Sequence, residues 1–205
     1  AVGVFGVVVV EEGEIGVRVA RALYEGGVRV VEFSLRGKGG LEALRRVRRE
    51  LRNVILGAGT VLTVEQVLEV KEVGVDFAVS PGLSERVLGA AKEVGLSYAP
   101  GVATPGEIQR ALEWGCKVMK FFPAEGLGGL RYLKMASGPF AGLGVHFLAM
   151  GGIGEDKLED YLAEPLIAAV GGSWLVPSEF VKAEKWSEIC SIAKRAREIV
   201  KKRRI

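Results

Sequence analysis

The sequence predicts an α/β protein that folds as a single (β/α)8 TIM barrel. Short apolar runs alternate with amphipathic stretches along all 205 residues, and glycine stands at several of the joins. Eight such β/α units fit a closed parallel barrel, and no linker or low-complexity segment divides them. We therefore expect one domain over 1–205. An open doubly wound sheet is the alternative, but eight units without a second domain favour closure.

Each apolar run is predicted to be a buried strand. Both faces of a parallel sheet in such a fold are covered, so its strands are almost continuously apolar. In chain order the predicted strands are Phe5–Val10, Val28–Leu35, Val54–Gly59, Phe77–Pro81, Tyr98–Val102, Val118–Phe122, His146–Met150 and Ile167–Val170.

The stretches between the strands are predicted to be helices. Apolar residues recur in them at three- and four-residue steps, which gives a helix one buried face. Glycine often follows, because it accepts the left-handed backbone just past a helix C-terminus. The predicted helices are Glu14–Tyr24, Leu41–Leu51, Val64–Val73, Glu85–Val94, Gly106–Trp114, Leu130–Ala136, Glu155–Ala163 and Lys185–Lys202.

Composition limits the classes of partner and cofactor. The charge is nearly balanced, at +3 from 28 basic and 25 acidic residues, so we expect neither a nucleic-acid nor a membrane partner. No apolar stretch is long enough to span a membrane, and we expect a cytoplasmic protein with Cys116 and Cys190 reduced. One histidine and three aspartates provide no convincing metal-ligand cluster. The histidine, His146, starts a strand, so we expect it near the rim opposite the functional one.

Lys120 is the most informative residue, because it lies within a run that otherwise reads as a buried strand. A buried charge costs free energy unless it is paired or neutralised. A lysine removed from water loses its proton more easily, and the neutral amine is a nucleophile toward carbonyls. Alternation along the strand predicts that Lys120 and Phe122 share one face.

Glu32 repeats the anomaly in the second predicted strand. If that strand stays extended, Glu32, Ser34 and Arg36 share a face and point toward the mouth of the barrel. A buried Glu32–Lys120 ion pair that only fixes register is the structural alternative, but such pairs stabilise weakly. Functional groups of barrels gather at the C-terminal ends of the strands, so we interpret these charges as catalytic.

Loops after the predicted strands supply further candidates. Thr60 either caps the next helix or offers a hydroxyl to a substrate carboxylate. Pro81 is typical of a turn former that shapes its loop, and we count it among the substrate-binding candidates. Glycine pairs follow the last two strands, where barrels frequently bind phosphate through backbone N–H groups. These phosphate-binding candidates are Gly151, Gly152, Gly172 and Ser173.

Six motifs, spread in order over nearly the whole chain, resemble the class I aldolases for 2-dehydro-3-deoxy-6-phosphogluconate (KDPG) and 4-hydroxy-2-oxoglutarate (KHG). They are VEFSLR (31–36), GAGTV (57–61), SPGL (80–83), PGVATP (100–105), KFFPAE (120–125) and GGSWLV (171–176). The resemblance implies a cofactor-free homotrimer of (β/α)8 barrels. It would cleave KDPG to pyruvate and glyceraldehyde 3-phosphate, KHG to pyruvate and glyoxylate, or both.

The resemblance also implies residue roles. Lys120 would form a Schiff base with the keto carbon, and Glu32 would shuttle protons. Arg36 and Thr60 would hold the carboxylate of the 2-keto acid substrate, and Arg36 would help to lower the pKa of Lys120. The distal phosphate would be held by Gly151, Gly152, Gly172 and Ser173.

The chain departs from the family pattern near these residues. Gly37 stands where the family usually has threonine, and Ala149-Met150 stands where it usually has Pro-Thr. One alternative is therefore an engineered or diverged aldolase-like barrel, acting as a trimeric assembly scaffold or on a different 2-keto acid. Another is a phosphate-binding isomerase that uses Glu32 as its base.

Overall fold

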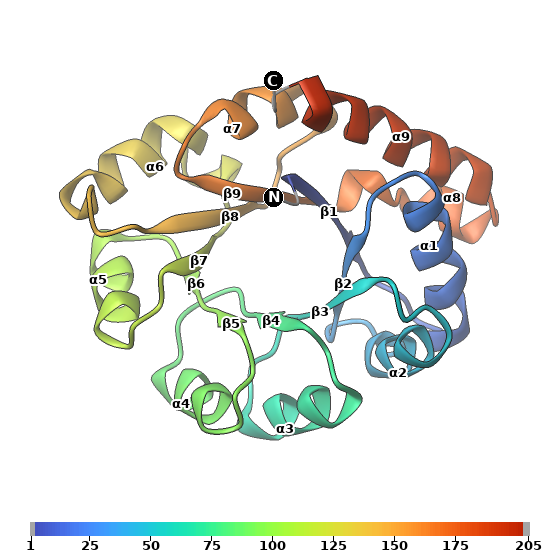
Figure 1. The fold of residues 1–205 in the computed structure, drawn as a ribbon, viewed down its shortest axis with the longest axis horizontal. Coiled ribbons are helices and arrows are strands. Elements are labelled where there is room, and N and C mark those ends of the chain that lie inside the picture. Colours follow the sequence, from blue (N-terminus) through green and yellow to red (C-terminus); the bar gives the residue numbers. More distant parts are fainter. Residues whose placement is uncertain (1–2, 203–205) are drawn as a thin grey trace.

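The computed structural model describes residues 3–202, which form a ring of parallel strands with helices on the outside (Figure 1). The strands are β1 (Gly3–Val8), β2 (Val30–Ser34), β3 (Ile55–Gly59), β4 (Phe77–Val79), β5 (Tyr98–Ala99), β6 (Gly101–Val102), β7 (Val118–Phe121), β8 (His146–Met150) and β9 (Ile167–Gly172). The helices are α1 (Gly13–Glu25), α2 (Gly40–Glu50), α3 (Val64–Val73), α4 (Glu85–Glu93), α5 (Pro105–Glu113), α6 (Gly129–Ser137), α7 (Leu158–Ala163), α8 (Ser178–Lys182) and α9 (Trp186–Lys202). The predicted TIM barrel is confirmed.

The ring closes through the chain itself at Pro100. The strand order is β5-β4-β3-β2-β1-β9-β8-β7-β6, and the two edge strands β5 and β6 are separated in sequence only by this proline. Proline has no N–H to donate to a sheet ladder, although its carbonyl still accepts the Lys120 N–H at 2.8 Å. The predicted strand Tyr98–Val102 is therefore interrupted at Pro100 and forms two short strands.

Apolar side chains pack in two places. The larger cluster fills the space between the sheet and the helices and includes Leu23, Phe33 and Met119. The smaller cluster consists of Phe5, Val30, Met150 and Ala169. Since strand side chains alternate, these two clusters lie on opposite faces of the sheet, and the smaller one lies inside the ring.

Several predicted boundaries differ from the structure. β1 begins at Gly3 and ends at Val8, and β2 ends at Ser34, so Arg36 lies in a turn rather than on the strand. The predicted helix Glu155–Ala163 begins as a short 3₁₀ helix before α7. Sequence periodicity does not reveal α8, because its 5 residues are too few to show a helical pattern.

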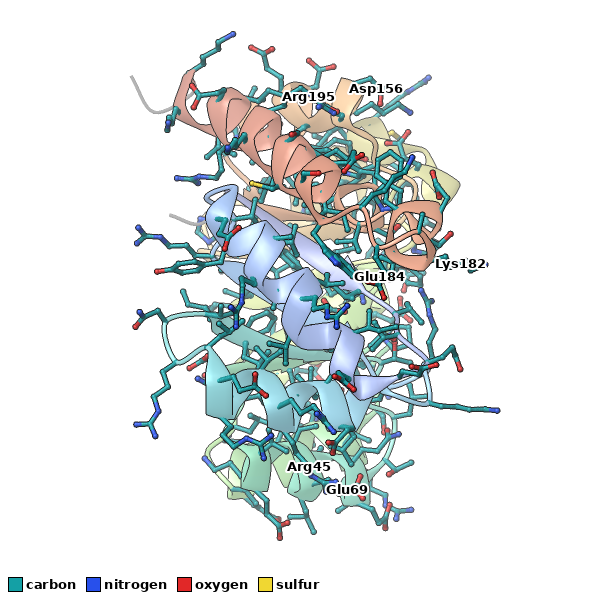
Figure 2. All side chains as sticks on the ribbon, turned by 90° about the vertical axis from the view of Figure 1, so that its right-hand side faces the viewer. Arg45, Glu69, Asp156, Lys182, Glu184 and Arg195 are labelled. Atoms are coloured by element: carbon teal, nitrogen blue, oxygen red, sulfur yellow. The ribbon has the colours of Figure 1, made fainter. Side chains whose placement is uncertain are left out.

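The outside of the barrel is charged. Long charged side chains extend from the helices, among them Arg45, Glu69 and Arg195 (Figure 2). His146 is exposed at the first residue of β8, so it lies at the N-terminal rim, as expected. Within residues 3–202, no helix combines the length and the apolar character needed to cross a membrane.

Candidate active site

Lys120 lies inside the ring with only 5% of its surface exposed. Its neighbours in β7, Met119 and Phe121, point the other way into the core beneath the helices. The Lys120 Nζ lies 5.0 Å from the centroid of the Phe122 ring, and both residues line one cavity of about 1000 Å³. The predicted alternation is therefore correct, and it places the amine at the cavity wall.

Glu32 faces the same cavity and is 1% exposed. Its carboxylate occupies the space above Gly59 in β3, where any side chain would overlap it. The Glu32 Oε2 atom is buried and accepts no hydrogen bond from the described part of the chain. A buried oxygen without a partner is costly, which is typical of a group kept for chemistry rather than for stability.

Burial shifts both ionisable groups toward their uncharged forms. It raises the pKa of Glu32, and the opposing charges of Lys120 and Arg36 act against this rise. Burial lowers the pKa of Lys120, Glu32 opposes that change, and Arg36 adds to it. A neutral amine can attack a carbonyl, and a protonated acid can donate, so the two groups are suited to exchange protons with a substrate.

The structural alternative for these charges is not observed. Among residues 3–202, no ion pair joins Glu32 to Lys120. The two side chains therefore do not fix the register of the barrel through a direct contact. They share a cavity and influence each other only through their electrostatic fields.

Arg36 reaches the mouth of the cavity from the turn after β2. Ser34, the last residue of β2, accepts the Arg36 N–H through its Oγ at 3.4 Å. The same hydroxyl is hydrogen-bonded to the Thr60 Oγ1 at 2.8 Å. Ser34 therefore links the turn that carries Arg36 to the end of β3, a role that the sequence alone did not assign.

Thr60 has a left-handed backbone, with φ of 59°. This conformation is rare for a β-branched residue, and such strain concentrates at functional sites. The helix-capping interpretation of Thr60 is wrong, because Thr63 caps α3 by accepting the Gln66 N–H at 3.2 Å. The Thr60 hydroxyl instead lies at the cavity wall beside Ser34.

Pro81 lines the cavity from the loop after β4. The adjacent Ser80 donates from its Oγ to the Gly82 carbonyl at 2.6 Å, which closes the turn around Pro81. Gly101 packs directly on the Pro81 backbone, where a Cβ would overlap. The turn interpretation is correct, and the turn holds Pro81 at the wall.

Two glycine-rich loops form another side of the cavity. Gly151 and Gly152 follow β8 with φ of 97° and 80°, which favours glycine. Gly172 ends β9, and Ser173 begins a short 3₁₀ helix. Within residues 3–202, the N–H groups of Gly152 and Ser173 donate to no other backbone group. These free donors at the cavity suit an anion.

Glu125 braces the first of these loops by donating its N–H to the Gly151 carbonyl at 3.0 Å, although sequence reasoning gave it no role. Its carboxylate accepts the Tyr161 hydroxyl at 2.6 Å and pairs with Lys157. The Lys157 hydrogen bond, followed by that of Tyr161, lowers the pKa of Glu125. The sequence signals are the place of Glu125 just after the Lys120 strand and at the end of the KFFPAE motif, whereas its partners come more than thirty residues later.

Sequence reasoning also missed the outer part of the cavity. It is lined by Glu11 and Glu12 from the loop after β1, by Trp174 after β9 and by Lys182 at the end of α8. Lys182 lies at the outer edge of the molecule at the end of α8 (Figure 2). Across residues 3–202, no three His, Cys, Asp or Glu side chains are grouped to hold a metal ion.

Known proteins match this chain in sequence over most of its length. A family model described as KDPG and KHG aldolase matches residues 1–192. The KHG/KDPG aldolase of Escherichia coli K12 is 42% identical over 190 residues, which cover 93% of this chain and 88% of that protein.

Two solved structures share the fold and the sequence pattern. KDPG aldolase from Legionella pneumophila, with pyruvate captured as a covalent carbinolamine intermediate, has a TM-score of 0.91 and 37% identity, covering 96% of this chain and 94% of that one. The aldolase of Zymomonas mobilis ZM4 with 3-phosphoglycerate has a TM-score of 0.87 and 36% identity, covering 95% and 90%.

Proposed function

This chain belongs to the KDPG and KHG aldolase family, and from that premise we propose that it is a class I aldolase whose Schiff base forms on Lys120. It is a lyase that cleaves a 4-hydroxy-2-keto acid to pyruvate and an aldehyde. KDPG would release glyceraldehyde 3-phosphate, and KHG would release glyoxylate. The observation that carries the assignment of Lys120 is its buried amine, with a lowered pKa, at the wall of the cavity.

The reaction begins when the neutral Lys120 amine attacks the C2 carbonyl of the keto acid. Loss of water from the carbinolamine gives a protonated imine. The C3–C4 bond then breaks: its electron pair moves into the imine, and the C4 hydroxyl loses its proton as the aldehyde forms. Protonation of the resulting enamine at C3 and hydrolysis of the imine release pyruvate and free Lys120.

Glu32 moves the protons in this sequence. Burial raises the pKa of Glu32, which favours the protonated acid, and this acid gives its proton to the departing hydroxyl of the carbinolamine. The resulting carboxylate accepts the proton of the C4 hydroxyl and returns it to C3. A neighbour solved with pyruvate as a covalent carbinolamine supports this chemistry.

The substrate carboxylate binds beside Arg36 and Thr60. Arg36 supplies the positive charge, Thr60 supplies a hydroxyl, and Pro81 shapes the surface beside them. The strained backbone of Thr60 supports a functional role for that hydroxyl.

A distal phosphate, where the substrate has one, binds the two glycine-rich loops. Its contacts are the backbone N–H groups of Gly151, Gly152 and Gly172 and the hydroxyl and N–H of Ser173. A relative solved with 3-phosphoglycerate supports a phosphorylated ligand.

Trapping with borohydride tests the proposal. Incubation with pyruvate and sodium borohydride should add one reduced pyruvate to the protein, and peptide mass spectrometry should locate it on Lys120. Lys120→Ala should not trap, whereas Lys134→Ala, on the exposed surface, should trap like the parent. Equal trapping by Lys120→Ala would overturn the assignment.

We also propose that one domain spans the chain, that three copies associate, and that the protein is cytoplasmic. Exposed apolar residues near α3, Leu62 and Leu68, offer surface for an interface, which light scattering after gel filtration would test. The two free cysteines, Cys116 and Cys190, suit a reducing compartment. Family membership favours the aldolase over a scaffold, and borohydride trapping separates it from an isomerase.

A further inference from the structure

A pair of opposite charges holds the first glycine-rich loop at both ends. The loop runs over residues 151–154, all of which line the cavity. At its start, the Glu125 N–H donates to the Gly151 carbonyl at 3.0 Å. At its end, the Lys157 N–H donates to the Gly154 carbonyl at 3.3 Å. The side chains of the two donors form an ion pair, so one contact between residues 32 apart in sequence closes the loop.

The Glu125 side chain also supports the loop directly. A Cβ at position 152 would come within 2.8 Å of the Glu125 Cβ, so Gly152 packs closely against this side chain. Within residues 3–202, the Gly152 N–H donates to no other backbone group and is available to an anion. The Tyr161 hydroxyl donates to the Glu125 carboxylate at 2.6 Å and ties it to α7. The position of this anion donor therefore depends on Glu125.

A carboxylate is an unfavourable support for an anion site, because its charge repels the ligand. The hydrogen bond from Lys157, followed by that from Tyr161, lowers the pKa of Glu125, so the carboxyl group is ionised. The same hydrogen bond raises the pKa of Lys157, so the amine is also charged and the pair is neutral. An ion pair whose lysine is 46% exposed adds little to stability, so stability alone does not explain it.

The other acids of this segment are paired or exposed. The Glu155 carboxylate accepts two hydrogen bonds from the Arg195 guanidinium, at 2.9 and 3.1 Å. Asp156 is exposed to solvent and adds to the rise in the pKa of Lys157. Glu125 is the acid that packs against Gly152, so its compensation matters most for a ligand at this loop.

The inference rests on the proposed function, in which the distal phosphate binds the glycine-rich loops. We propose that Lys157 is a positioning residue for this phosphate: by cancelling the charge of Glu125, it gives the enzyme a preference for phosphorylated over unphosphorylated 2-keto acids. A phosphate monoester carries nearly two negative charges at neutral pH. Without Lys157, the phosphate would bind beside an uncompensated carboxylate.

Two substrates that differ only in the phosphate provide the test. KDPG and its unphosphorylated counterpart, 2-dehydro-3-deoxygluconate, are each cleaved by the enzyme, and kcat and KM are measured from pyruvate release. The quotient of the two kcat/KM values is the phosphate preference. The other charged residues of the outer cavity, Glu11, Glu12 and Lys182, are the same in every variant. A change in the preference therefore reports the Glu125–Lys157 pair.

Lys157→Met leaves the Glu125 carboxylate uncompensated. The phosphate preference should fall about 10-fold through a higher KM for KDPG, while kcat for KDPG and both constants for the unphosphorylated substrate stay within about 2-fold of the parent. Lys157→Arg keeps the charge and should keep the preference. Glu125→Gln combined with Lys157→Met removes both charges, so the preference should return to within about 3-fold of the parent.

Lys134→Met is the matched control. Lys134 forms an ion pair with Glu164 at 2.7 Å, and its side chain is exposed as that of Lys157 is. Neither Lys134 nor Glu164 is among the described residues that line the cavity. This variant therefore loses a comparable ion pair and should keep the phosphate preference of the parent.

Salt separates an effect of charge from an effect of structure. Raising the ionic strength from about 0.1 M to about 1 M shortens the screening length from about 10 Å to about 3 Å. The ratio of KM for KDPG in Lys157→Met to KM in the parent should therefore decrease with added salt. A loop that had only lost its shape would give the same ratio at both salt concentrations and would overturn the inference.

The inference also fails if Lys157→Met keeps the phosphate preference, if the double variant loses it as fully as Lys157→Met, or if the parent has no such preference. Lys157→Gln is measured beside Lys157→Met, so one that does not fold leaves the other to decide. Pyruvate trapping on Lys120 is followed in every protein. Absence of trapping in the parent would defeat the proposed function, whereas normal trapping with an unchanged preference would defeat only the role of Lys157.

Discussion

Gly59→Ala should abolish proton transfer without removing a single functional group. Gly59 ends β3, where it pairs with Ser34 and accepts the Leu35 N–H through its carbonyl at 2.8 Å. A methyl group at this position would overlap the end of the Glu32 side chain, with the carboxyl carbon Cδ at 2.6 Å and the methylene Cγ at 2.9 Å. Because the strand is held on both sides, the Glu32 side chain must move instead.

The size of the effect follows from the role of Glu32. Loss of a positioned general acid or base lowers a rate by about 100-fold to 10,000-fold, which corresponds to about 3–5 kcal/mol on the barrier. Forcing one methyl group into a packed site also costs about 1–3 kcal/mol of stability. We expect kcat for pyruvate release to fall by about 100-fold or more, while the protein remains folded.

Gly57→Ala is the matched control. Gly57 lies on the same strand and the same face, but its methyl group would overlap the Phe77 ring rather than Glu32. Both variants suffer overpacking, and only one displaces the carboxylate. Pyruvate release is followed with lactate dehydrogenase, and stability is followed by thermal unfolding.

The comparison is extended by placing Gly59→Ala in a Glu32→Gln background, where it should reduce kcat little further. If Gly59→Ala keeps kcat within about 3-fold of the parent, or if it loses no more activity than Gly57→Ala, the reasoning about Glu32 is refuted.

Substitutions at three residues address the electrostatics and the carboxylate end of the cavity. Arg36→Gln removes a positive charge that lowers the pKa of Lys120, so the acid limb of the pH profile for borohydride trapping should move to higher pH. Arg36→Lys should leave that limb in place, and a shift in the opposite direction would contradict the assignment. Lys120→Met should stabilise the fold near neutral pH, because burial disfavours the charged amine. The pKa of Lys120 in the folded protein lies below 10.5, its ordinary value in the unfolded chain. Between these two pKa values the unfolded chain binds more protons than the folded protein, so the parent gains stability as pH rises. The advantage of Lys120→Met in urea unfolding should therefore disappear above that range, and a constant advantage at all pH values would show that the charge is irrelevant. Ser34→Ala removes the partner of the Thr60 hydroxyl and should raise KM for the keto acid by about 5-fold, as expected for one hydrogen bond. Ser34→Thr should restore KM, and the interpretation is wrong if it does not.

Local chemistry in the sequence is sufficient to predict the two buried ionisable residues that line the cavity. Lys120 and Glu32 are charges within apolar runs, and alternation along each strand predicts which neighbours share their face. Both signals are local, because the apolar residues on either side of Lys120 and Glu32 indicate that each strand is buried.

The roles of Ser34, Gly59 and Glu125 cannot be found in this way. Each depends on a partner from another element: Thr60 for Ser34, Glu32 for Gly59, and Tyr161 for Glu125. The glycine at 59 reads as a common strand-end residue until the carboxylate above it is seen.

The order of residues is enough to specify the barrel, its succession of strands and helices, and the identity of its two buried charges. Three features emerge only when the chain is folded: the ring closes at Pro100, the turn after β2 carries Arg36 to the cavity, and Met150 lines the same cavity as Lys120. The two groups of features differ in how far apart along the chain the interacting residues lie. Periodicity and burial act along a few consecutive residues, whereas the cavity is formed where the ends of different strands meet.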